Sequence, residues 1–244
     1  MRQELKGRVA LVTGGSGGIG RALVAALASA GSDVAVGYRS NEQAALESVE
    51  QARRLGVRSV AVRCDLSEPA EAVSLADDVE QLLGGVDLFV SNAGLGIRAG
   101  ADEIDEALWR ATHAVNLESP FLLTRRLAGP MAGRGFGRVL YVSSVAAFTG
   151  GLVGPHYASA KAGLQGLVAW FSSHLAERGV TVNAIAPALV EGTAMLPVSG
   201  PGAAPTPVGR YGTPEEVAEL ALAMLANGYL TGKVVLLDGG LYPR

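Results

Sequence analysis

Short apolar runs recur along the chain, and longer segments of mixed polarity separate them. The first run, Val9–Thr13, is apolar at nearly every position, unlike the alternating pattern of a strand with one exposed face. Strands that are apolar on both faces are typical of a parallel sheet covered by helices on each side. The further runs of this kind are Asp33–Tyr38, Val57–Arg63, Val86–Val90, Arg138–Ser143, Val180–Ile185 and Lys233–Leu237.

The segments between these runs have the length of helices. They cover residues 18–30, 41–55, 68–83, 102–128, 156–178 and 214–226. Ser67-Glu68-Pro69 and Thr213-Pro214-Glu215-Glu216 place a cap, a proline and acids in a first helical turn. Seven strands alternating with helices predict one doubly wound α/β domain over residues 1–244, with a seven-stranded parallel sheet flanked by helices on both faces. The stretch 194–210, rich in proline and glycine, is expected to form a substrate flap.

The composition agrees with a packed α/β protein built mainly from small aliphatic residues. Hydrophobic residues make up 49% of the 244 residues and aromatic residues only 5%, so Ala, Val and Leu must supply most of the core. This balance of apolar and charged residues excludes a disordered chain. The 33 glycines are clustered and follow no G-X-Y period, which excludes collagen and indicates sharp turns or close backbone approaches.

Charge and cysteine content narrow the expected partners and location. The formal net charge is −3 and the basic residues form no cluster, so we expect no binding of nucleic acid. The single cysteine, Cys64, allows no internal disulfide and is typical of a reducing cytoplasm. The first apolar run is too short for a signal sequence, and no run approaches the length of a membrane span. We therefore expect a soluble, cytoplasmic protein without a membrane partner.

A glycine-rich loop directly follows the first predicted strand and opens the first predicted helix. Glycines at such a place let the backbone approach a pyrophosphate, which then binds amide groups at the positive end of the helix. A plain tight turn does not need this many glycines. The loop therefore predicts a dinucleotide site, and its expected cofactor-binding residues are Gly14, Ser16, Gly18, Ile19 and Gly20.

Two other motifs share part of this glycine pattern. Gly14-Gly15-Ser16-Gly17-Gly18 formally matches the G-x-S-x-G nucleophile elbow, but no acid and histidine follow at convincing strand ends. The phosphate loop of ATPases needs Lys and then Ser or Thr after the last glycine, where this chain has Arg21-Ala22. Both interpretations are therefore set aside.

The end of the second predicted strand indicates which dinucleotide binds. An acid at this place typically binds the ribose 2′-hydroxyl of NAD, whereas arginine suits a 2′-phosphate. The chain has Arg39 and Ser40 here and no carboxylate, so a planar donor fork and a hydroxyl are available. Taken alone, Arg39 fits a solvated surface arginine better, but the absence of the acid favours NADP(H) over NAD(H).

A tyrosine and a lysine lie one helical turn apart after the fifth predicted strand. In Tyr157-Ala158-Ser159-Ala160-Lys161 the two side chains share a helix face, so the ammonium can lie beside the phenol. A cation within about 4–6 Å lowers the pKa of a phenol, which can then donate a proton to a carbonyl oxygen as hydride arrives. Tyr-x-x-x-Lys alone is common on surfaces, but here Ser143-Ser144 ends the preceding strand. The pair is therefore a candidate general acid with its tuning cation.

Together with later motifs, these residues resemble the short-chain dehydrogenase/reductase family, and within it the 3-oxoacyl-acyl-carrier-protein reductases. The resemblance covers essentially the whole chain and implies a Rossmann fold. The motifs that carry it are Thr13-Gly14-x-x-x-Gly18-x-Gly20, Ser91-Asn92-Ala93-Gly94, Asn116, Ser144, Tyr157, Lys161, Asn183 to Pro187, Thr193, Thr231-Gly232 and Asp238-Gly239-Gly240. One departure is Gly17, where many NADP enzymes of this type carry a basic residue.

The resemblance implies a role for each of four catalytic residues. Tyr157 would be the general acid or base, and Ser144 would hydrogen-bond the carbonyl oxygen of the substrate. Lys161 would bind the nicotinamide ribose and lower the pKa of Tyr157, while Asn116 would hold a water that relays protons to Lys161. No metal is expected, because the histidines have no ligand spacing with other metal-binding residues.

The same resemblance extends to further cofactor contacts and to partners. The cofactor contacts are Asp65 and Leu66 at the adenine, Asn92, Ala93 and Gly94 by the adenosine ribose, and Pro187, Val190 and Thr193 at the nicotinamide carboxamide. A homotetramer is implied, and Gly163 and Gly166 on the helix after Lys161 are expected to let subunits approach. Arg178 and Arg134 match positions where an acidic acyl carrier protein would dock, although plain surface arginines explain them about as well.

The sequence thus predicts an NADPH-dependent reductase that transfers a hydride to a ketone, with Tyr157 as general acid. A 3-oxoacyl thioester of acyl carrier protein or CoA is the leading substrate class, because the resemblance is strongest there. A dehydrogenase of the same family for alcohols, sugars, steroids or other small carbonyl compounds is the alternative. A non-catalytic dinucleotide-sensing domain is an alternative from another class, which the complete set of catalytic residues disfavours.

Overall fold

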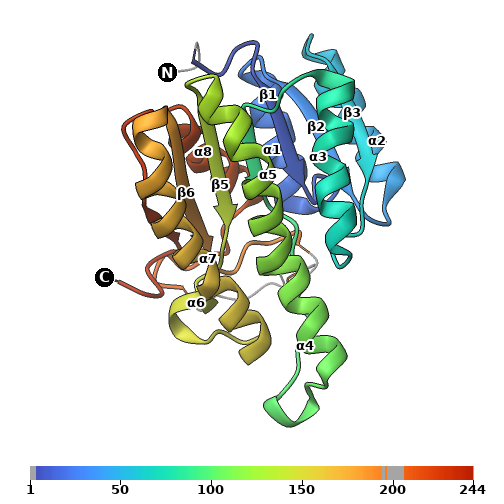
Figure 1. The fold of residues 1–244 in the computed structure, drawn as a ribbon. Coiled ribbons are helices and arrows are strands. Elements are labelled where there is room, and N and C mark those ends of the chain that lie inside the picture. The colour runs from blue at the N-terminus through green and yellow to red at the C-terminus, as the bar shows by residue number, and fades with distance from the viewer. Residues whose placement is uncertain (1–3, 194–195, 197–205, 244) are drawn as a thin grey trace.

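The apolar runs form a parallel sheet in the order β3-β2-β1-β4-β5-β6-β7 (Figure 1). The computed structural model describes residues 4–193, 196 and 206–243, and all strand bounds below refer to these residues. The strands are β1 (Val9–Thr13), β2 (Asp33–Tyr38), β3 (Ser59–Arg63), β4 (Leu88–Ser91), β5 (Gly137–Val142), β6 (Val180–Pro187) and β7 (Val234–Leu237). All neighbouring pairs are parallel, so the carboxyl ends of the strands share one edge of the sheet. Most of the flap expected at 194–210 lies outside the described residues.

Helices cover both faces of this sheet, which confirms the doubly wound α/β fold expected from the sequence. They are α1 (Gly18–Ser29), α2 (Glu42–Arg54), α3 (Pro69–Leu83), α4 (Glu106–His113), α5 (Ser119–Gly133), α6 (Ala146–Thr149), α7 (Pro155–Leu175) and α8 (Pro214–Leu225). Leu11, Phe89 and Val139 point to one apolar cluster, shared with α3, α5 and α7. Their strand neighbours, such as Val12 and Val90, point to a second cluster with α1, α2 and α8. Figure 1 shows α3 and α5 in front of the sheet and α1 and α8 behind it.

The expected helix at 102–128 is the least accurate of the predicted elements. A 3₁₀ turn covers Ala101–Glu103, and α4 begins only after Asp105, whose carboxylate accepts a hydrogen bond from the Leu108 amide at 2.7 Å. Helical structure then continues through a π-helical turn, Ala114–Glu118, into α5. The helix ends later than expected because Met131, in its last turn, is buried in the apolar cluster with the strands, a contact that local sequence signals do not contain.

Of the two helix caps expected from the sequence, one is observed and the other is not. Thr213 caps α8 as expected: its hydroxyl accepts a hydrogen bond from the Glu216 amide, and the Glu216 carboxylate accepts one from the Thr213 amide. Ser67 does not cap α3, because its hydroxyl donates to Asp65 at 2.7 Å instead. The side chain of Ser67 therefore stabilises the loop at the end of β3 and not the helix.

In the long helix α7, packing within the chain explains why one position is glycine. A Cβ atom on Gly163 would lie 2.8 Å from the side chain of Leu117, so this glycine allows α7 to pack against the π-helical turn. Gly166 has no neighbour within 4 Å of such an atom, and Trp170 is 57% exposed on the same helix. Gly163 therefore allows close packing within the chain, while the expected contact of this helix with another subunit stays a prediction.

The two expected docking arginines lie at the edge of the sheet where strands begin. Arg178 directly precedes Gly179 and β6, and Arg134 precedes β5. Arg134 donates to the Val86 carbonyl at 2.5 Å and pairs with Asp87 at 3.3 Å. Within one chain, Arg178 and Arg134 therefore lie at the amino ends of the strands, opposite to the edge of the sheet where the strands end.

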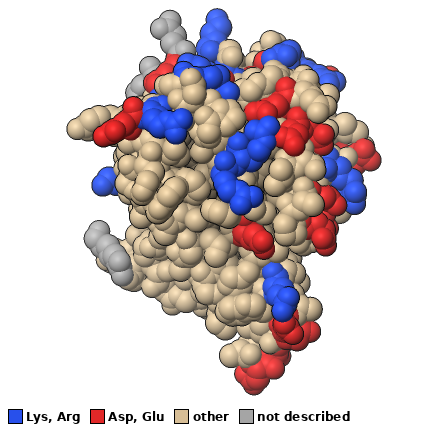
Figure 2. Space-filling view, in the orientation of Figure 1, with Lys and Arg blue, Asp and Glu red and all other residues tan. Residues whose placement is uncertain are grey.

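The charged side chains are distributed without segregation on the face seen in Figure 2. Blue and red groups lie next to one another over its upper and right parts and again at its lower tip, with an uncharged area between them. Within the described part of the chain, no helix combines the length and the apolar character needed to cross a bilayer.

Candidate active site

The glycine loop between β1 and α1 is shaped so that a side chain would not fit at its key positions. A Cβ atom on Gly20 would lie 2.0 Å from the Gly14 carbonyl oxygen, and one on Gly18 would lie 2.2 Å from the Gly192 carbonyl oxygen. Gly14 has a φ of +64°, a conformation that glycine adopts readily. The helix α1 begins at Gly18 without a side-chain cap and without an acid in its first turn. Its first amide groups are therefore available to an anion.

The residues after β4 hold this loop in place. The backbone amides of Asn92 and Ala93 donate to the Thr13 hydroxyl at 3.1 and 3.2 Å. The side-chain amide of Asn92 donates to the carbonyls of Thr13 and Gly14, both at 3.1 Å. Thr13 and Asn92 thus join the ends of β1 and β4, while Gly94 lies exposed beyond them.

The segment after β6 closes against the same loop. It runs from Pro187 at the end of the strand to Thr193, whose hydroxyl donates to the Val190 carbonyl at 3.0 Å. Val190 is buried and forms a bridge with Gly212, and the Gly192 carbonyl lies against Gly18 as described. The structure therefore brings Thr193, one of the residues expected at the nicotinamide, next to the start of α1.

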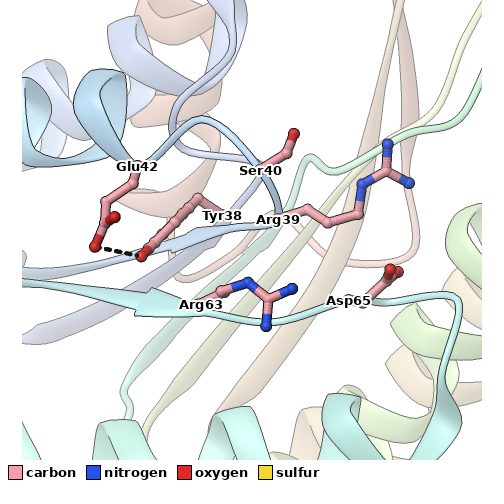
Figure 3. A pocket seen from close by; sticks show the side chains of 6 residues that line it. All are labelled: Tyr38, Arg39, Ser40, Glu42, Arg63 and Asp65. Atoms are coloured by element: carbon pink, nitrogen blue, oxygen red, sulfur yellow. Dashed lines mark hydrogen bonds between the residues drawn. The ribbon is translucent and has the colours of Figure 1, made fainter.

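A pocket lies at the ends of β2 and β3. Six side chains line it: Tyr38, Arg39, Ser40, Glu42, Arg63 and Asp65 (Figure 3). The Tyr38 hydroxyl donates to Glu42 at 3.2 Å, and Asp65 accepts hydrogen bonds from the amide and the hydroxyl of Ser67. These bonds from Ser67, followed by the charges of Arg39 and Arg63, hold the pKa of Asp65 below its usual value. Leu66, the next residue, is buried beside this pocket.

The arginine and serine expected to bind a 2′-phosphate therefore share a pocket with the aspartate expected at the adenine. Arg63 was missed by sequence reasoning, because arginine near the end of a strand is an ordinary surface residue. Two features point to Arg63: it lies two residues before Asp65 in the chain, and it is opposite Tyr38 in the register of β2 and β3.

The expected catalytic tyrosine and serine are in contact. Tyr157 is in the first turn of α7 and is 5% exposed, while Ser144 follows β5 and accepts a hydrogen bond from the Ala146 amide at 3.1 Å. Burial raises the pKa of Tyr157 to about 12, and the hydrogen bond with Ser144 lowers it in part. The phenol therefore keeps its proton at neutral pH, as a proton donor must.

Burial and the hydrogen bond with Ser144 are the causes that shift the pKa of Tyr157 in this structure. The expected lowering of this pKa by Lys161 stays a prediction. Its ammonium is 5.7 Å from the centre of the tyrosine ring and donates to the Val142 carbonyl at 2.8 Å. Burial lowers the pKa of Lys161 to about 8, because the charged form loses its hydration. The Ser143 hydroxyl donates to the Lys161 carbonyl at 3.1 Å, so the end of β5 and the first turns of α7 are joined by two hydrogen bonds.

Asn116 lies in the π-helical turn and is fully buried. Its side-chain amide donates to the carbonyls of Leu95 and Thr112 at 2.8 and 2.9 Å, and its carbonyl accepts from the Leu95 amide at 3.3 Å. Asn116 therefore holds the loop after β4 in place, and its π-helical turn packs against α7. π-Helical turns inside α-helices occur frequently at functional sites.

His156, directly before Tyr157 in the chain, is fully buried. Its Nε2 donates to the Ile97 carbonyl at 3.0 Å, since a carbonyl can only accept. Its Nδ1 has no hydrogen-bond partner in the described residues. His156 thus joins the loop after β4 to the start of α7, and no local pattern in the sequence indicates this contact.

These observations fit a nicotinamide dinucleotide. The glycine loop leaves a cradle that Cβ atoms would fill, the start of α1 presents amide groups, and two arginines and a serine line the pocket at the end of β2. Tyr157, Ser144 and Lys161 lie where the strands end. No group of three or more His, Cys, Asp or Glu side chains in the described residues is arranged to hold a metal ion.

Comparison with known proteins decides the family. Residues 8–202 match the family described as short chain dehydrogenase. The chain belongs to the short-chain dehydrogenase family. Members of this family are oxidoreductases that act on alcohol or ketone groups and use nicotinamide dinucleotide cofactors.

Curated short-chain dehydrogenases similar to this chain act on different substrates. The 3-oxoacyl-[acyl-carrier-protein] reductase of Aquifex aeolicus is 35% identical, over 99% of this chain and 100% of that protein. An acetoacetyl-CoA reductase of Rhizobium meliloti is 37% identical, over 96% of this chain and 98% of that protein. An NADP⁺-dependent L-rhamnose 1-dehydrogenase of Thermoplasma acidophilum is 33% identical, over 98% of this chain and 97% of that protein.

Solved short-chain dehydrogenases share the fold over nearly their full length. One from Serratia marcescens has a TM-score of 0.88 and 32% identity, over 97% of this chain and 98% of that one. One from Burkholderia cenocepacia, in complex with NADP, has a TM-score of 0.89 and 30% identity, over 97% of this chain and 98% of that one.

Proposed function

We propose that this short-chain dehydrogenase is an NADPH-dependent ketone reductase in which Tyr157 donates the proton. The observation that carries the proposal is the buried Tyr157 hydroxyl, which is hydrogen-bonded to Ser144 and has a pKa raised to about 12. When bound, NADPH would supply the hydride from C4 of its nicotinamide. The Ser144 hydroxyl would donate a hydrogen bond to the carbonyl oxygen of the substrate, and Tyr157 would protonate this oxygen as negative charge develops on it.

Lys161 and Asn116 would keep this arrangement in position. Lys161 joins α7 to the end of β5 through the Val142 carbonyl, close to where a nicotinamide ribose would lie. Asn116 would hold the loop after β4 at the other side of the substrate through Leu95. That Asn116 holds a proton-relaying water stays a prediction.

The experiment that tests the reaction is the variant Tyr157→Phe. This change removes one hydroxyl and keeps the ring that packs in the buried site. The rate of ketone reduction should fall by roughly 10³-fold, the usual contribution of a general acid, while NADPH binding stays within about twofold. Full activity of the variant would refute the role of Tyr157. Absence of reduction in the wild type with tight cofactor binding would favour the dinucleotide-sensing alternative.

We propose a 3-oxoacyl thioester as the substrate class, because the loop that precedes Tyr157 has no charged residue and exposes apolar side chains. The loop from Val145 to His156 contains no charged residue, and it is joined to the loop after β4 by the bond from the Ala99 amide to the Val153 carbonyl. Leu152 is 72% and Ile97 is 52% exposed on these loops. Such surfaces suit an acyl chain, whereas a sugar needs hydrogen-bonding side chains for its hydroxyls.

The substrate proposal is tested by steady-state kinetics in both directions. With NADPH, kcat/KM for acetoacetyl thioesters should exceed that for small sugar-derived ketones by at least about tenfold. The opposite order, or efficient oxidation of L-rhamnose with NADP⁺, would favour the sugar dehydrogenase alternative. The names of the relatives support both substrate classes, so only this comparison separates them.

The partners and the location of the protein stay predictions. We infer a homotetramer in which the exposed part of α7 around Gly166 and Trp170 contacts another copy, and sedimentation would test it. Docking of an acyl carrier protein at Arg178 and Arg134 and a cytoplasmic location also remain to be tested. The proposed preference for NADPH is supported by Arg39 and Ser40 in the pocket at the end of β2.

A further inference from the structure

Arg63 extends the expected phosphate site beyond β2. It is the last residue of β3 and lies opposite Tyr38, the last residue of β2, in the register of the two strands. Its side chain lies in the pocket between Tyr38 and Asp65, and Arg39 and Ser40 lie on the other side of it (Figure 3). Two guanidinium groups from neighbouring strands therefore enter one pocket.

Both of these guanidinium groups act on Asp65 only through their charge, without a direct ion pair or hydrogen bond in the described residues, unlike other arginines nearby. Arg21 of the glycine-loop helix pairs with Glu47 at 3.6 Å, and Arg53 of α2 donates to the Ser59 carbonyl. In the described part of the chain, neither Arg39 nor Arg63 has an ion pair within 4.0 Å or a hydrogen bond to another group. Donors that remain available at the end of a strand are suited to an external anion.

The carboxylates of the same pocket make a second cation necessary. Glu42 and Asp65 both line the pocket and would repel a phosphate group. Arg39 alone would leave the pocket with a net negative charge, whereas Arg39 and Arg63 together balance the two acids. Glu42 and Asp65 also accept hydrogen bonds from Tyr38 and Ser67, which leaves them less able to pair with the arginines.

We propose that Arg63 is a second phosphate-binding residue, which together with Arg39 and Ser40 recognises the 2′-phosphate of NADP(H). The proposal rests on the proposed NADPH dependence and assigns a determinant of it. It also accounts for Gly17, since the glycine loop offers no basic side chain at that position and β3 supplies the missing charge. Arg63 would act on cofactor selectivity and not on the chemical step, which takes place at Tyr157.

The proposal is tested by calorimetric binding of two ligands that differ only in the 2′-phosphate. These are adenosine 2′,5′-bisphosphate and adenosine 5′-monophosphate. Arg63→Gln should weaken binding of the bisphosphate about tenfold, the effect of losing one charge-assisted hydrogen bond, and change binding of the monophosphate less than about twofold. Arg63→Lys keeps the charge but loses the planar fork, so its loss should be smaller, about threefold.

A matched control is Arg54→Gln on α2, which removes an exposed arginine that pairs with Glu50. It should leave the binding of both ligands unchanged. Equal weakening of both ligands by Arg63→Gln, or no change with the bisphosphate, would overturn the proposal for Arg63. Failure of the proposed NADPH dependence gives a different result, because the wild type would then bind both ligands equally well.

Discussion

Lys161 is a buried amine at the candidate active site, and its replacement by methionine should stabilise the fold while it abolishes activity. The side chain is 3% exposed, and burial lowers its pKa from 10.5 to about 8. Its ammonium donates one hydrogen bond, to the Val142 carbonyl at 2.8 Å. Methionine has a similar length and no charge, so it fills the same space without the cost of dehydrating an ammonium.

The structure gives the expected magnitude of this effect. The difference between the ordinary pKa of lysine and a pKa of about 8 corresponds to about 3 kcal/mol of destabilisation when the amine is protonated in both states. Loss of the hydrogen bond to Val142 should cost about 1 kcal/mol. At pH 7 the Lys161→Met variant should therefore be more stable than the wild type by about 2 kcal/mol.

The pH dependence has a definite sign. Because the folded-state pKa of Lys161 is lowered, its destabilising effect is fully present below about pH 8 and disappears as the pH rises from there towards 10.5. In that range the unfolded chain holds one more proton, so the stability contribution of Lys161 increases with pH. The advantage of Lys161→Met should shrink over this range and reverse when only the lost hydrogen bond remains.

The assay is urea-induced unfolding of both proteins from about pH 6 to about pH 10, with ketone reduction measured in parallel. Groups that titrate in both proteins cancel in the difference between the two stabilities. Lys233→Met, at an exposed lysine, is the matched control and should show no such dependence on pH. A variant Lys161→Met that is less stable at pH 7, or a difference that does not change with pH, would refute the reasoning.

Two further predictions concern the glycine loop and a helix cap. Gly20→Ala should lower stability by about 1–3 kcal/mol and weaken cofactor binding, because its Cβ would lie 2.0 Å from the Gly14 carbonyl oxygen. Gly17→Ala should be tolerated, because its Cβ would lie 3.5 Å from the same oxygen. Calorimetry of cofactor binding and urea unfolding compare the two variants. Thr213→Ala should lower stability by about 1 kcal/mol through loss of the α8 cap, whereas Thr213→Ser should retain the cap. An unchanged midpoint of urea unfolding for Thr213→Ala would contradict the role of the cap.

The strands could be predicted closely because each is a local signal. Val9–Thr13 and Asp33–Tyr38 are observed with the predicted bounds, since a run of apolar β-type residues has few stable conformations outside a buried sheet. The helix expected at 102–128 was wrong in its details, because its start depends on the Asp105 cap and its continuation to Gly133 on the burial of Met131 in the core. Ser67 shows the same limit, since its hydroxyl donates to Asp65 and makes no cap for the helix that follows.

The residues of the candidate site also fall into two groups, those that the sequence predicts and those that only the structure reveals. The glycine loop, Tyr157 and Lys161 are recognisable because their spacing alone places them on a strand–loop–helix turn and on one helix face. Arg63 and His156 were missed, because their neighbours, Arg39 and Ile97, come from other segments of the chain. Only the register between β2 and β3 reveals that Arg63 shares a pocket with Arg39.

By itself, the sequence determined the order of the elements, the parallel sheet and the types of residue at its carboxyl edge. These follow from periodicity and spacing, which are properties of neighbours along the chain. The tertiary structure decided the burial of Lys161, the raised pKa of Tyr157 and the placement of two arginines in one pocket. The pKa of a group depends on the solvent it loses and the charges it approaches, and both are set by segments that are distant in sequence.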